Sequence, residues 1–188
     1  MQAFDFDNTI YKGESSFDFA LYVVKHELKL LKYLPAILKV LFSYKSEHLS
    51  ADEYANLLNK YIGIFLENKE RILELVDGFW ATHERKLYLN MLEKIHFNDV
   101  IITTAPDFLM KGIKKRLRTA NILCTKTDLK KGTLVYLNFH ENKVKAFKKK
   151  YPKKTIKNFY TDSYNDAPFM DFSKNVYLVS HGDCTKIK

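Results

Sequence analysis

The first nine residues constrain the fold more than any other stretch of this chain. A short apolar run at residues 3–6 carries Asp5, and Asp7 and Asn8 follow at once. Residues two apart in a strand point to the same face, so a strand that ends here can bring two carboxylates together. Like charges a few ångströms apart raise one another's pKa or require a cation. The stretch is therefore either a functional acidic cluster at the end of a buried strand or a surface turn with Asp and Asn as turn formers.

The size and charge of the chain limit its domain organisation and its partners. With 188 residues, of which 46% are hydrophobic, we expect one domain, or one domain with a sizeable insertion. The formal net charge of +9 suggests an anionic partner: a phosphate ester, a nucleic acid or an anionic membrane. The lysines, however, gather in runs such as 114–116 and 148–150, which are typical of solvated helix faces. We therefore expect no nucleic-acid partner.

Cysteine and histidine usage gives no sign of a metal site. Cys124 and Cys184 are far apart and form no C-x-x-C motif, so neither a metal site nor a disulfide framework is indicated. This pattern fits a reducing, cytoplasmic location. Because the first residues already belong to the acidic strand, no signal peptide is expected. The six histidines show no metal-ligand spacing, and we interpret them as structural or exposed.

Residues 13–90 show helical periodicity and no clear strand. Apolar residues recur at helical spacing from residue 17 to about residue 33, and Pro35 ends that helix and can occupy the first turn of the next. Ser50 and Glu53 form an S-x-x-E capping box at the start of a third helix. Two further helices are predicted over residues 69–76 and 79–89. The sequence therefore predicts an all-helical insertion after the first strand.

From residue 99 onward, strands and helices alternate. Strands are predicted at residues 99–103, 122–125, 155–161 and 175–179, with a hairpin arm at 134–138 and a helix at 141–150. Such alternation predicts an α/β fold with a doubly wound, Rossmann-like parallel sheet. Ligands of these sheets bind at the carboxyl ends of the strands, near the point where the strand order reverses. Asp5, Asp7, Thr103 and Asp162 each fall at such an end, which favours a functional acidic cluster.

Four ordered motifs resemble those of the haloacid dehalogenase (HAD) superfamily. They are Asp5-Phe-Asp-Asn-Thr9, Thr103 closing a strand, Lys143 opening a helix, and Asp162-Ser-Tyr-Asn-Asp166 closing another strand. The first and fourth motifs are specific, because D-x-D-x-T and D-S-x-x-D at strand ends rarely co-occur by chance. The second and third are single residues found by position. One departure is Asn8, where many members have Gly.

The resemblance also implies a division of the chain. Residues 1–12 and 91–188 would form the catalytic core, and residues 13–90 would form a helical cap that resembles the C1 cap of phosphoserine-phosphatase-like members. Such a cap closes over the strand ends, excludes water and sets substrate specificity.

Phosphoryl transfer through an aspartyl-phosphate is the chemistry that the resemblance implies. Asp5 would be the nucleophile, and Asp7 would protonate the leaving alcohol and then activate water. Mg²⁺ would bind Asp5, the backbone carbonyl of Asp7, and Asp162. Asp166 would also belong to the metal site, orienting waters or Lys143. An acid at position 7 distinguishes phosphatases from dehalogenases in this superfamily.

The substrate phosphate would be held by Asn8, Thr103 and Lys143. Thr104 is an alternative to Thr103, because both lie at the end of the same strand. Lys145 is likewise an alternative to Lys143. The two lysines are two residues apart and therefore lie on different faces of the helix, so only one can point into the site. Lys143 is favoured because it is nearer the first turn of the helix.

The first half of the cap leaves two interpretations open. Residues 17–45 combine apolar residues with Lys25, Lys29, Lys32, Lys39 and Lys45. They cannot span a bilayer, because charges and Pro35 interrupt every apolar run well short of about 18 residues. They form either a helical hairpin packed on the core or a basic amphipathic surface that lies on an anionic membrane. The layout is loosely similar to the cap of phosphatidylglycerophosphate-phosphatase-like members, which adds a lipid-linked or other amphiphilic phosphate to phosphoserine and similar small esters as candidate substrates.

The leading hypothesis from the sequence is a Mg²⁺-dependent phosphomonoester hydrolase that acts on a small or amphiphilic phosphate ester. A phosphotransferase of the same fold is an alternative. A non-catalytic module that binds membrane or nucleic acid through its basic surface is another. All four motif positions carry the expected residues, which argues against this last class. A protein that had lost its catalytic activity would be expected to have lost at least one of them.

Overall fold

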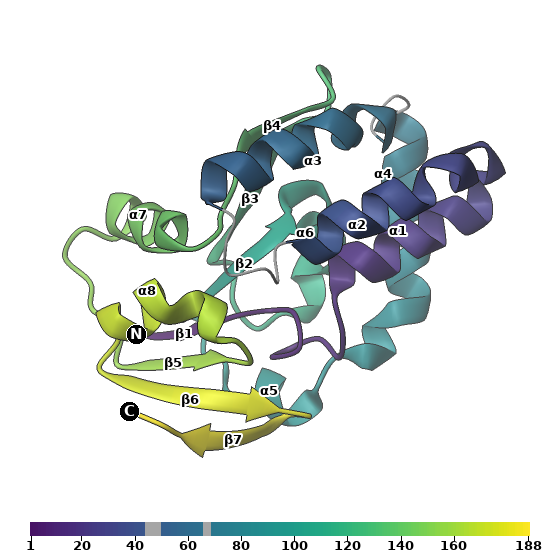
Figure 1. Cartoon of the computed structure of the whole chain (residues 1–188). Helices are drawn as coiled ribbons and strands as arrows, with labels where there is room; N and C mark the ends of the chain where they lie inside the picture. The colour runs from purple at the N-terminus through teal and green to yellow at the C-terminus, as the bar shows by residue number, and fades with distance from the viewer. Residues whose placement is uncertain (44–49, 66–68) are drawn as a thin grey trace.

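A seven-stranded sheet forms the centre of the computed structural model, which describes residues 1–43, 50–65 and 69–188 (Figure 1). Its strands lie in the order β4-β3-β2-β1-β5-β6-β7. Their bounds are β1 Gln2–Phe4, β2 Val100–Pro106, β3 Ile122–Asp128, β4 Thr133–Tyr136, β5 Asn158–Thr161, β6 Asn175–Ser180 and β7 Asp183–Lys186. The five central strands, β3, β2, β1, β5 and β6, pair in parallel. The edge strands β4 and β7 pair antiparallel with β3 and β6. The predicted α/β class with a doubly wound, Rossmann-like sheet is therefore confirmed.

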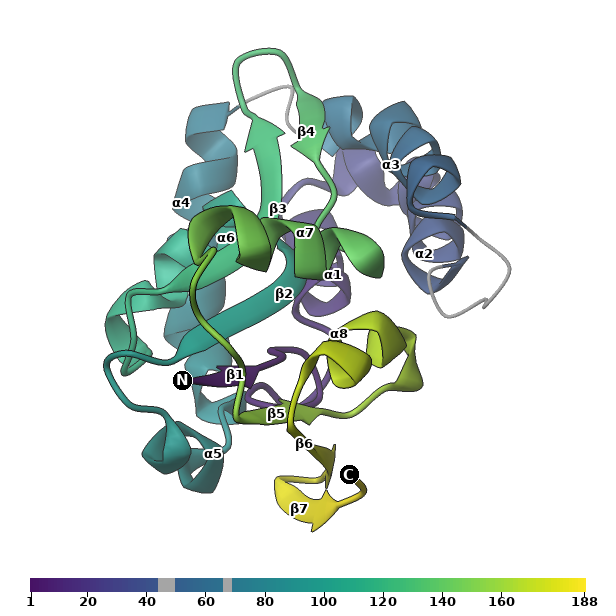
Figure 2. The same cartoon turned by 90° about the vertical axis from the view of Figure 1, so that its left-hand side faces the viewer.

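Helices cover both faces of the sheet (Figures 1 and 2). They are α1 Ser15–His26, α2 Leu34–Ser43, α3 Ala51–Phe65, α4 Lys69–His83, α5 Leu89–Lys94, α6 Asp107–Ile113, α7 Glu141–Lys150 and α8 Ala167–Phe172. Short 3₁₀ turns are η1 Leu28–Tyr33, η2 Glu84–Lys86, η3 Lys114–Arg116 and η4 Tyr164–Asp166.

Two hydrophobic layers lie on the two faces of the sheet, and a third cluster joins α2 and α3 to the segment after β4. Ala3 and Val100 face α7 and α8, where they belong to one cluster with Phe147 and Phe169. The next strand residues, Phe4 and Ile101, belong to the cluster on the opposite face, which includes side chains of α1, α4 and α6. This alternation follows from the two-residue repeat of a strand, and it explains why β1 and β2 read as continuous apolar runs.

The first predicted helix is shorter than expected. α1 ends at His26, and Glu27 leaves the helical region with φ −130° and ψ 74°. The chain continues as η1, in which Leu30 is buried but Leu28 and Leu31 are 73% and 55% exposed. The prediction of one helix over residues 17–33 was therefore wrong, because the helical phase changes at Glu27, whose carboxylate accepts a hydrogen bond from Arg71 Nε at 2.7 Å.

The fourth and fifth predicted helices are a single helix up to His83. α4 continues through Gly78, where the sequence indicated a break. A Cβ at this position would lie 2.6 Å from the hydroxyl oxygen of Tyr22 in α1. Glycine is therefore favoured here by close packing against the Tyr22 side chain and not by a turn, which is a tertiary cause that local sequence does not show. The chain then turns through η2 into α5, a helix that the sequence did not predict separately.

The helix starts at Pro35 and Ser50 agree with the sequence. Pro35 lies in the first turn of α2. The Glu53 carboxylate accepts hydrogen bonds from the Ser50 amide at 2.9 Å and hydroxyl at 2.7 Å, and the Ser50 hydroxyl accepts the Glu53 amide at 3.3 Å. The predicted capping box is confirmed. The last strand, β7, was not predicted; it forms a hairpin with β6 through His181 and Gly182, both of which have positive φ.

The helices after β1 pack side by side, from α4 through α1 and α2 to α3, which lies along β4 (Figures 1 and 2). The Leu134 amide of β4 donates to Asn59 Oδ1 of α3 at 2.8 Å. α1 and α4 share a hydrophobic cluster with the sheet, so the division into a core and a cap at residues 13–90 stays a prediction. In the described part of the chain, no helix is long and apolar enough to cross a membrane.

Candidate active site

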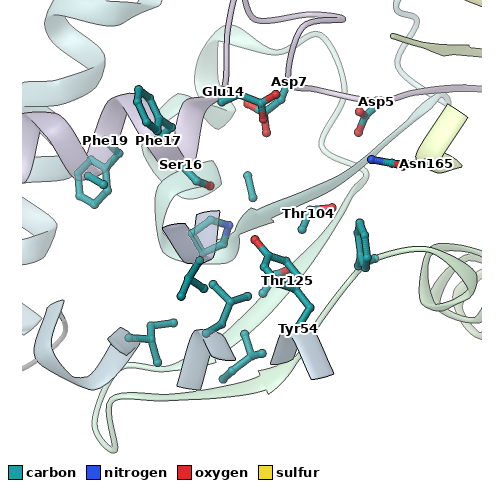
Figure 3. Close-up of a pocket in the computed structure, with 18 of the residues that line it drawn as sticks. Asp5, Asp7, Glu14, Ser16, Phe17, Phe19, Tyr54, Thr104, Thr125 and Asn165 are labelled. Atoms are coloured by element: carbon teal, nitrogen blue, oxygen red, sulfur yellow. The ribbon is translucent and has the colours of Figure 1, made fainter. Parts of the chain in front are cut away.

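The acidic residues gather where β1 and β5 lie side by side. Phe4 pairs with Tyr160 across these parallel strands, and the Asp5 amide donates to the Tyr160 carbonyl at 2.8 Å. Asp5 and Asp162 therefore leave neighbouring strands at the same edge of the sheet. With Asp7 and Asp166 they line a cavity of about 530 Å³. Figure 3 shows Asp5 and Asp7 at this cavity. The sequence-based argument from strand ends thus predicted which carboxylates would meet.

Lys143 joins two of these carboxylates. Its ammonium nitrogen lies 3.1 Å from Asp5 Oδ1 and 2.6 Å from Asp166 Oδ1, and all three residues are buried. Burial raises the pKa of Asp5 well above its usual value, and the Lys143 charge opposes this rise. Burial would lower the pKa of Lys143, but the charges of Asp166 and Asp5 outweigh it and raise that pKa. Both charged partners are therefore stabilised by their mutual contact.

The structure separates the two candidate lysines. Lys143, in the first turn of α7, points into the site, whereas Lys145 is exposed and donates to Asn142 Oδ1 at 3.3 Å. Asp166 also accepts the Thr161 hydroxyl on Oδ2 at 2.8 Å. Because both of its carboxylate oxygens are engaged, Asp166 is placed to orient Lys143.

Asp7 is held by the start of α1. Its Oδ1 accepts a hydrogen bond from the Ser15 amide at 2.6 Å. Burial raises the pKa of Asp7 to about 7, the charge of Glu14 adds to the rise, and the Ser15 hydrogen bonds oppose it. Burial also raises the pKa of Asp162 to about 6, again with a contribution from Glu14. A carboxyl with a pKa near neutrality can both donate and accept a proton.

Glu14 is a charged site residue that sequence reasoning missed. It lines the cavity beside Asp7 (Figure 3). The chain returns to Asp7 through a tight loop in which the Asn8 amide donates to the Gly13 carbonyl at 3.0 Å. The only local signal was its position just before the predicted start of α1.

Asn8 has a structural place in this loop. Its φ of 52° lies in the left-handed region that favours glycine, which explains why Gly is common at this position in the superfamily. Its side-chain amide donates to Glu14 Oε1 at 2.8 Å, and Asn8 is not among the residues that line the cavity. A contact of Asn8 with substrate phosphate stays a prediction.

Of the two candidate threonines, Thr104 reaches the cavity. Thr103 is fully buried, its Oγ1 accepts a hydrogen bond from the Ala105 amide at 3.0 Å, and it does not line the cavity. Thr104 lines the cavity, and its hydroxyl donates to the Asn138 carbonyl at 3.2 Å. The alternation along β2 turns the two side chains to different sides, and Thr104 is the one on the cavity wall. A contact of either threonine with substrate phosphate stays a prediction.

The donor set at the strand ends fits a hard divalent cation. Besides burial, the charges of Asp162 and Asp7 raise the pKa of Asp5, and the charge of Asp162 raises that of Asp7, so a cation among these carboxylates would relieve their repulsion. Carboxylate and carbonyl oxygens are the ligands that Mg²⁺ prefers. The described residues contain no group of three or more acidic, histidine or cysteine side chains arranged to hold a metal. In the predicted Mg²⁺ site only Asp5 and Asp162 would bind through side chains. Asp7 would bind through its carbonyl, and Asp166 would orient waters or Lys143.

Comparison with known proteins identifies the family. The sequence model of the haloacid dehalogenase-like hydrolases matches residues 3–171. The chain therefore belongs to the haloacid dehalogenase-like hydrolase family, and it is a hydrolase by family. The predicted membership of the superfamily is confirmed. No curated protein matched the sequence.

Solved structures share the fold at low sequence identity. A protein of unknown function from Bordetella pertussis Tohama I has a TM-score of 0.69 and 15% identity, over 94% of this chain and 87% of that one. A phosphoserine phosphohydrolase-like protein from Francisella tularensis subsp. tularensis SCHU S4 has a TM-score of 0.62 and 17% identity, over 94% and 86%. A phospho-aspartyl intermediate analogue of phosphoserine phosphatase has a TM-score of 0.55 and 15% identity, over 93% of this chain and 83% of that one.

The ion pairs of Lys143 predict a large effect on stability. Lys143→Met leaves the carboxylates of Asp5 and Asp166 buried without a cation, so we expect the free energy of unfolding to fall by about 3–5 kcal/mol. Urea denaturation at neutral pH without added metal measures it. Lys145→Met, on the exposed face of the same helix, is the control and should change this free energy by less than about 0.5 kcal/mol. Similar losses in both variants would contradict the assignment.

Proposed function

We propose that this hydrolase is a Mg²⁺-dependent phosphomonoesterase that acts through an aspartyl-phosphate at Asp5. The observation that carries the proposal is the Asp5 carboxylate at the cavity wall, 3.1 Å from Lys143 Nζ, with Asp7 and Asp162 lining the same cavity. Two structures that share the fold are described as a phosphoserine phosphatase and a phosphoserine phosphohydrolase-like protein, which supports a phosphate ester as the substrate class.

The reaction needs two displacements at phosphorus. In the first, a carboxylate oxygen of Asp5 attacks, the bond between phosphorus and the alcohol oxygen breaks, and protonated Asp7 gives its proton to that oxygen. In the second, Asp7 takes a proton from water as the water attacks the acyl phosphate, and the phosphorus–Asp5 bond breaks to release inorganic phosphate. The pKa of about 7 at Asp7 suits it to both steps.

The remaining residues would position and neutralise the phosphate. Phosphoryl transfer depends mainly on positioning and charge neutralisation. Lys143 would bind a phosphoryl oxygen, and the Thr104 hydroxyl lies on the cavity wall to hold another. Mg²⁺, held by Asp5, Asp162 and the Asp7 carbonyl, would supply positive charge next to the phosphate.

Transfer to an alcohol instead of water would use the same first step, so added alcohols and product analysis distinguish a phosphotransferase from a hydrolase. A non-catalytic binding module is less well supported, because it leaves the arrangement of Asp5, Asp7 and Lys143 without a use. A cytoplasmic location stays a prediction, supported by two cysteines that form no disulfide.

Hydrolysis should depend on Asp5 and on the cation. With Mg²⁺ and p-nitrophenyl phosphate, we expect Asp5→Asn to lower kcat by at least about 10³-fold, because the nucleophile is lost. EDTA should abolish wild-type turnover, and added Mg²⁺ should restore it. Asp171→Asn, on an exposed position of α8, is the control and should keep wild-type kcat. Full turnover in Asp5→Asn would refute the proposed nucleophile.

We also propose that the η1 corner of the cap contacts anionic membranes. Leu28 and Leu31 are 73% and 55% exposed there, and Lys25, Lys29 and Lys32 are exposed around them. Exposed leucines flanked by lysines are typical of a surface that enters the interface of an anionic bilayer. Lys45 lies outside the described residues.

Co-sedimentation with vesicles tests this contact. Vesicles of phosphatidylglycerol and phosphatidylcholine at low salt should bring down the wild-type protein, and Leu28→Ser/Leu31→Ser should stay in solution. Leu89→Ser removes an equally exposed leucine from α5, which lies elsewhere, and should bind like the wild type. Wild-type protein that stays in the supernatant would overturn the membrane contact.

A further inference from the structure

The cavity at Asp5 extends well beyond the acidic residues. Its volume of about 530 Å³ is typical of a site for a whole small ligand, not for phosphate alone. Away from Asp5 its walls come from α1, α2, α3 and β4, and they include Phe17, Phe19, Ile37, Val40, Leu58 and Leu134. Figure 3 shows Phe17 and Phe19 on the side of the cavity away from Asp5.

Charge is confined to one end of this cavity. Among the described residues, every charged side chain that lines it comes from the loop after β1, from α7 or from the turn after β5. Tyr54, Thr104 and Thr125 add hydroxyl groups to the walls but no charge. The walls supplied by α2, α3 and β4 are therefore uncharged, and most of their side chains are apolar.

This distribution disfavours a charged leaving group such as serine. The carboxylate of phosphoserine would need a cation in the cavity. In the part of the chain that the structure describes, Lys143 is the one cationic residue of the lining, and it contacts Asp5 and Asp166 at the end of the cavity where the phosphate would bind. A small polar alcohol would also leave the apolar walls of α2 and α3 in contact with water.

We propose that the substrate is the phosphate monoester of a hydrophobic alcohol, whose apolar chain lies between α1, α2, α3 and β4 while its phosphate lies at Asp5. The inference rests on the proposed phosphomonoesterase activity and names its substrate class. A lysophospholipid-type phosphate and the phosphate of a free long-chain alcohol share this chemistry.

A series of straight-chain alkyl phosphates from ethyl to octyl tests the proposal. These esters have leaving alcohols of nearly equal reactivity, so differences in kcat/KM report binding of the chain. With each ester below its aggregation concentration, kcat/KM should rise with length, by up to roughly fourfold for each added methylene. Phosphoserine should be turned over no better than ethyl phosphate. A flat series, or a preference for phosphoserine, would overturn the inference.

Substitutions at two neighbouring leucines of α3 test where the alkyl chain of the substrate binds. Leu58→Trp fills the cavity, so the ratio of octyl to ethyl phosphate turnover should fall at least tenfold. Leu57→Trp, on a residue that does not line the cavity, should keep the wild-type ratio. A ratio unchanged by Leu58→Trp would overturn the placement of the chain, and the wild-type series decides the substrate class even where that variant fails to fold.

The same assays separate the two levels of the proposal. Turnover of p-nitrophenyl and ethyl phosphates with no dependence on chain length would keep the proposed function and overturn only the substrate class. Absence of turnover for every ester would overturn both. A lysophosphatidic acid with an octanoyl chain, compared with octyl phosphate, shows whether a glycerol linker is accepted between phosphate and chain.

Discussion

The contact of Lys143 with Asp5 and Asp166 is the interaction on which the rest of the site depends. It joins the end of β1, the first turn of α7 and the turn after β5. Lys143 Nζ lies 3.1 Å from Asp5 Oδ1 and 2.6 Å from Asp166 Oδ1. One buried ammonium faces two buried carboxylates, and Asp7, Glu14 and Asp162 add further acidic groups to the same cavity. The site is therefore short of positive charge, which suits it to a divalent cation rather than to a closed structural ion pair.

The fold brings this arrangement about by strand order. β1 lies between β2 and β5 in the sheet. After the helices that follow Gly13, the chain forms β2 and β3 on one side of β1, and it later crosses to form β5 and β6 on the other side. The carboxyl ends of β1 and β5 then meet at the reversal point, where α/β sheets bind ligands. The helices after Gly13 supply most of the apolar walls. Under the proposed function, the strand ends would position the phosphate and these helices would select the alcohol.

The sequence predicted those parts of the site that depend on strand ends. Asp5 and Asp162 follow from the parallel sheet, and Lys143 from its place in the first turn of α7. Other features depend on contacts between distant segments. Glu14 reaches the cavity through the loop after β1, in which Asn8 has φ 52° and donates a side-chain hydrogen bond to Glu14. Gly78 lies inside α4, where the Tyr22 side chain of α1 packs against it. Thr103 and Thr104 face different sides because side chains alternate along β2. The sequence alone does not tell which of the two faces the cavity.

Covalent capture of the intermediate tests the central claim most directly. The protein is mixed with Mg²⁺ and p-nitrophenyl phosphate, quenched with acid during turnover and treated with borohydride, which reduces an acyl phosphate to an alcohol. Peptide mass spectrometry should then find homoserine in place of Asp5, and only when substrate and Mg²⁺ are both present. Reduction at another residue, or rapid turnover without any modified Asp5, would contradict the account.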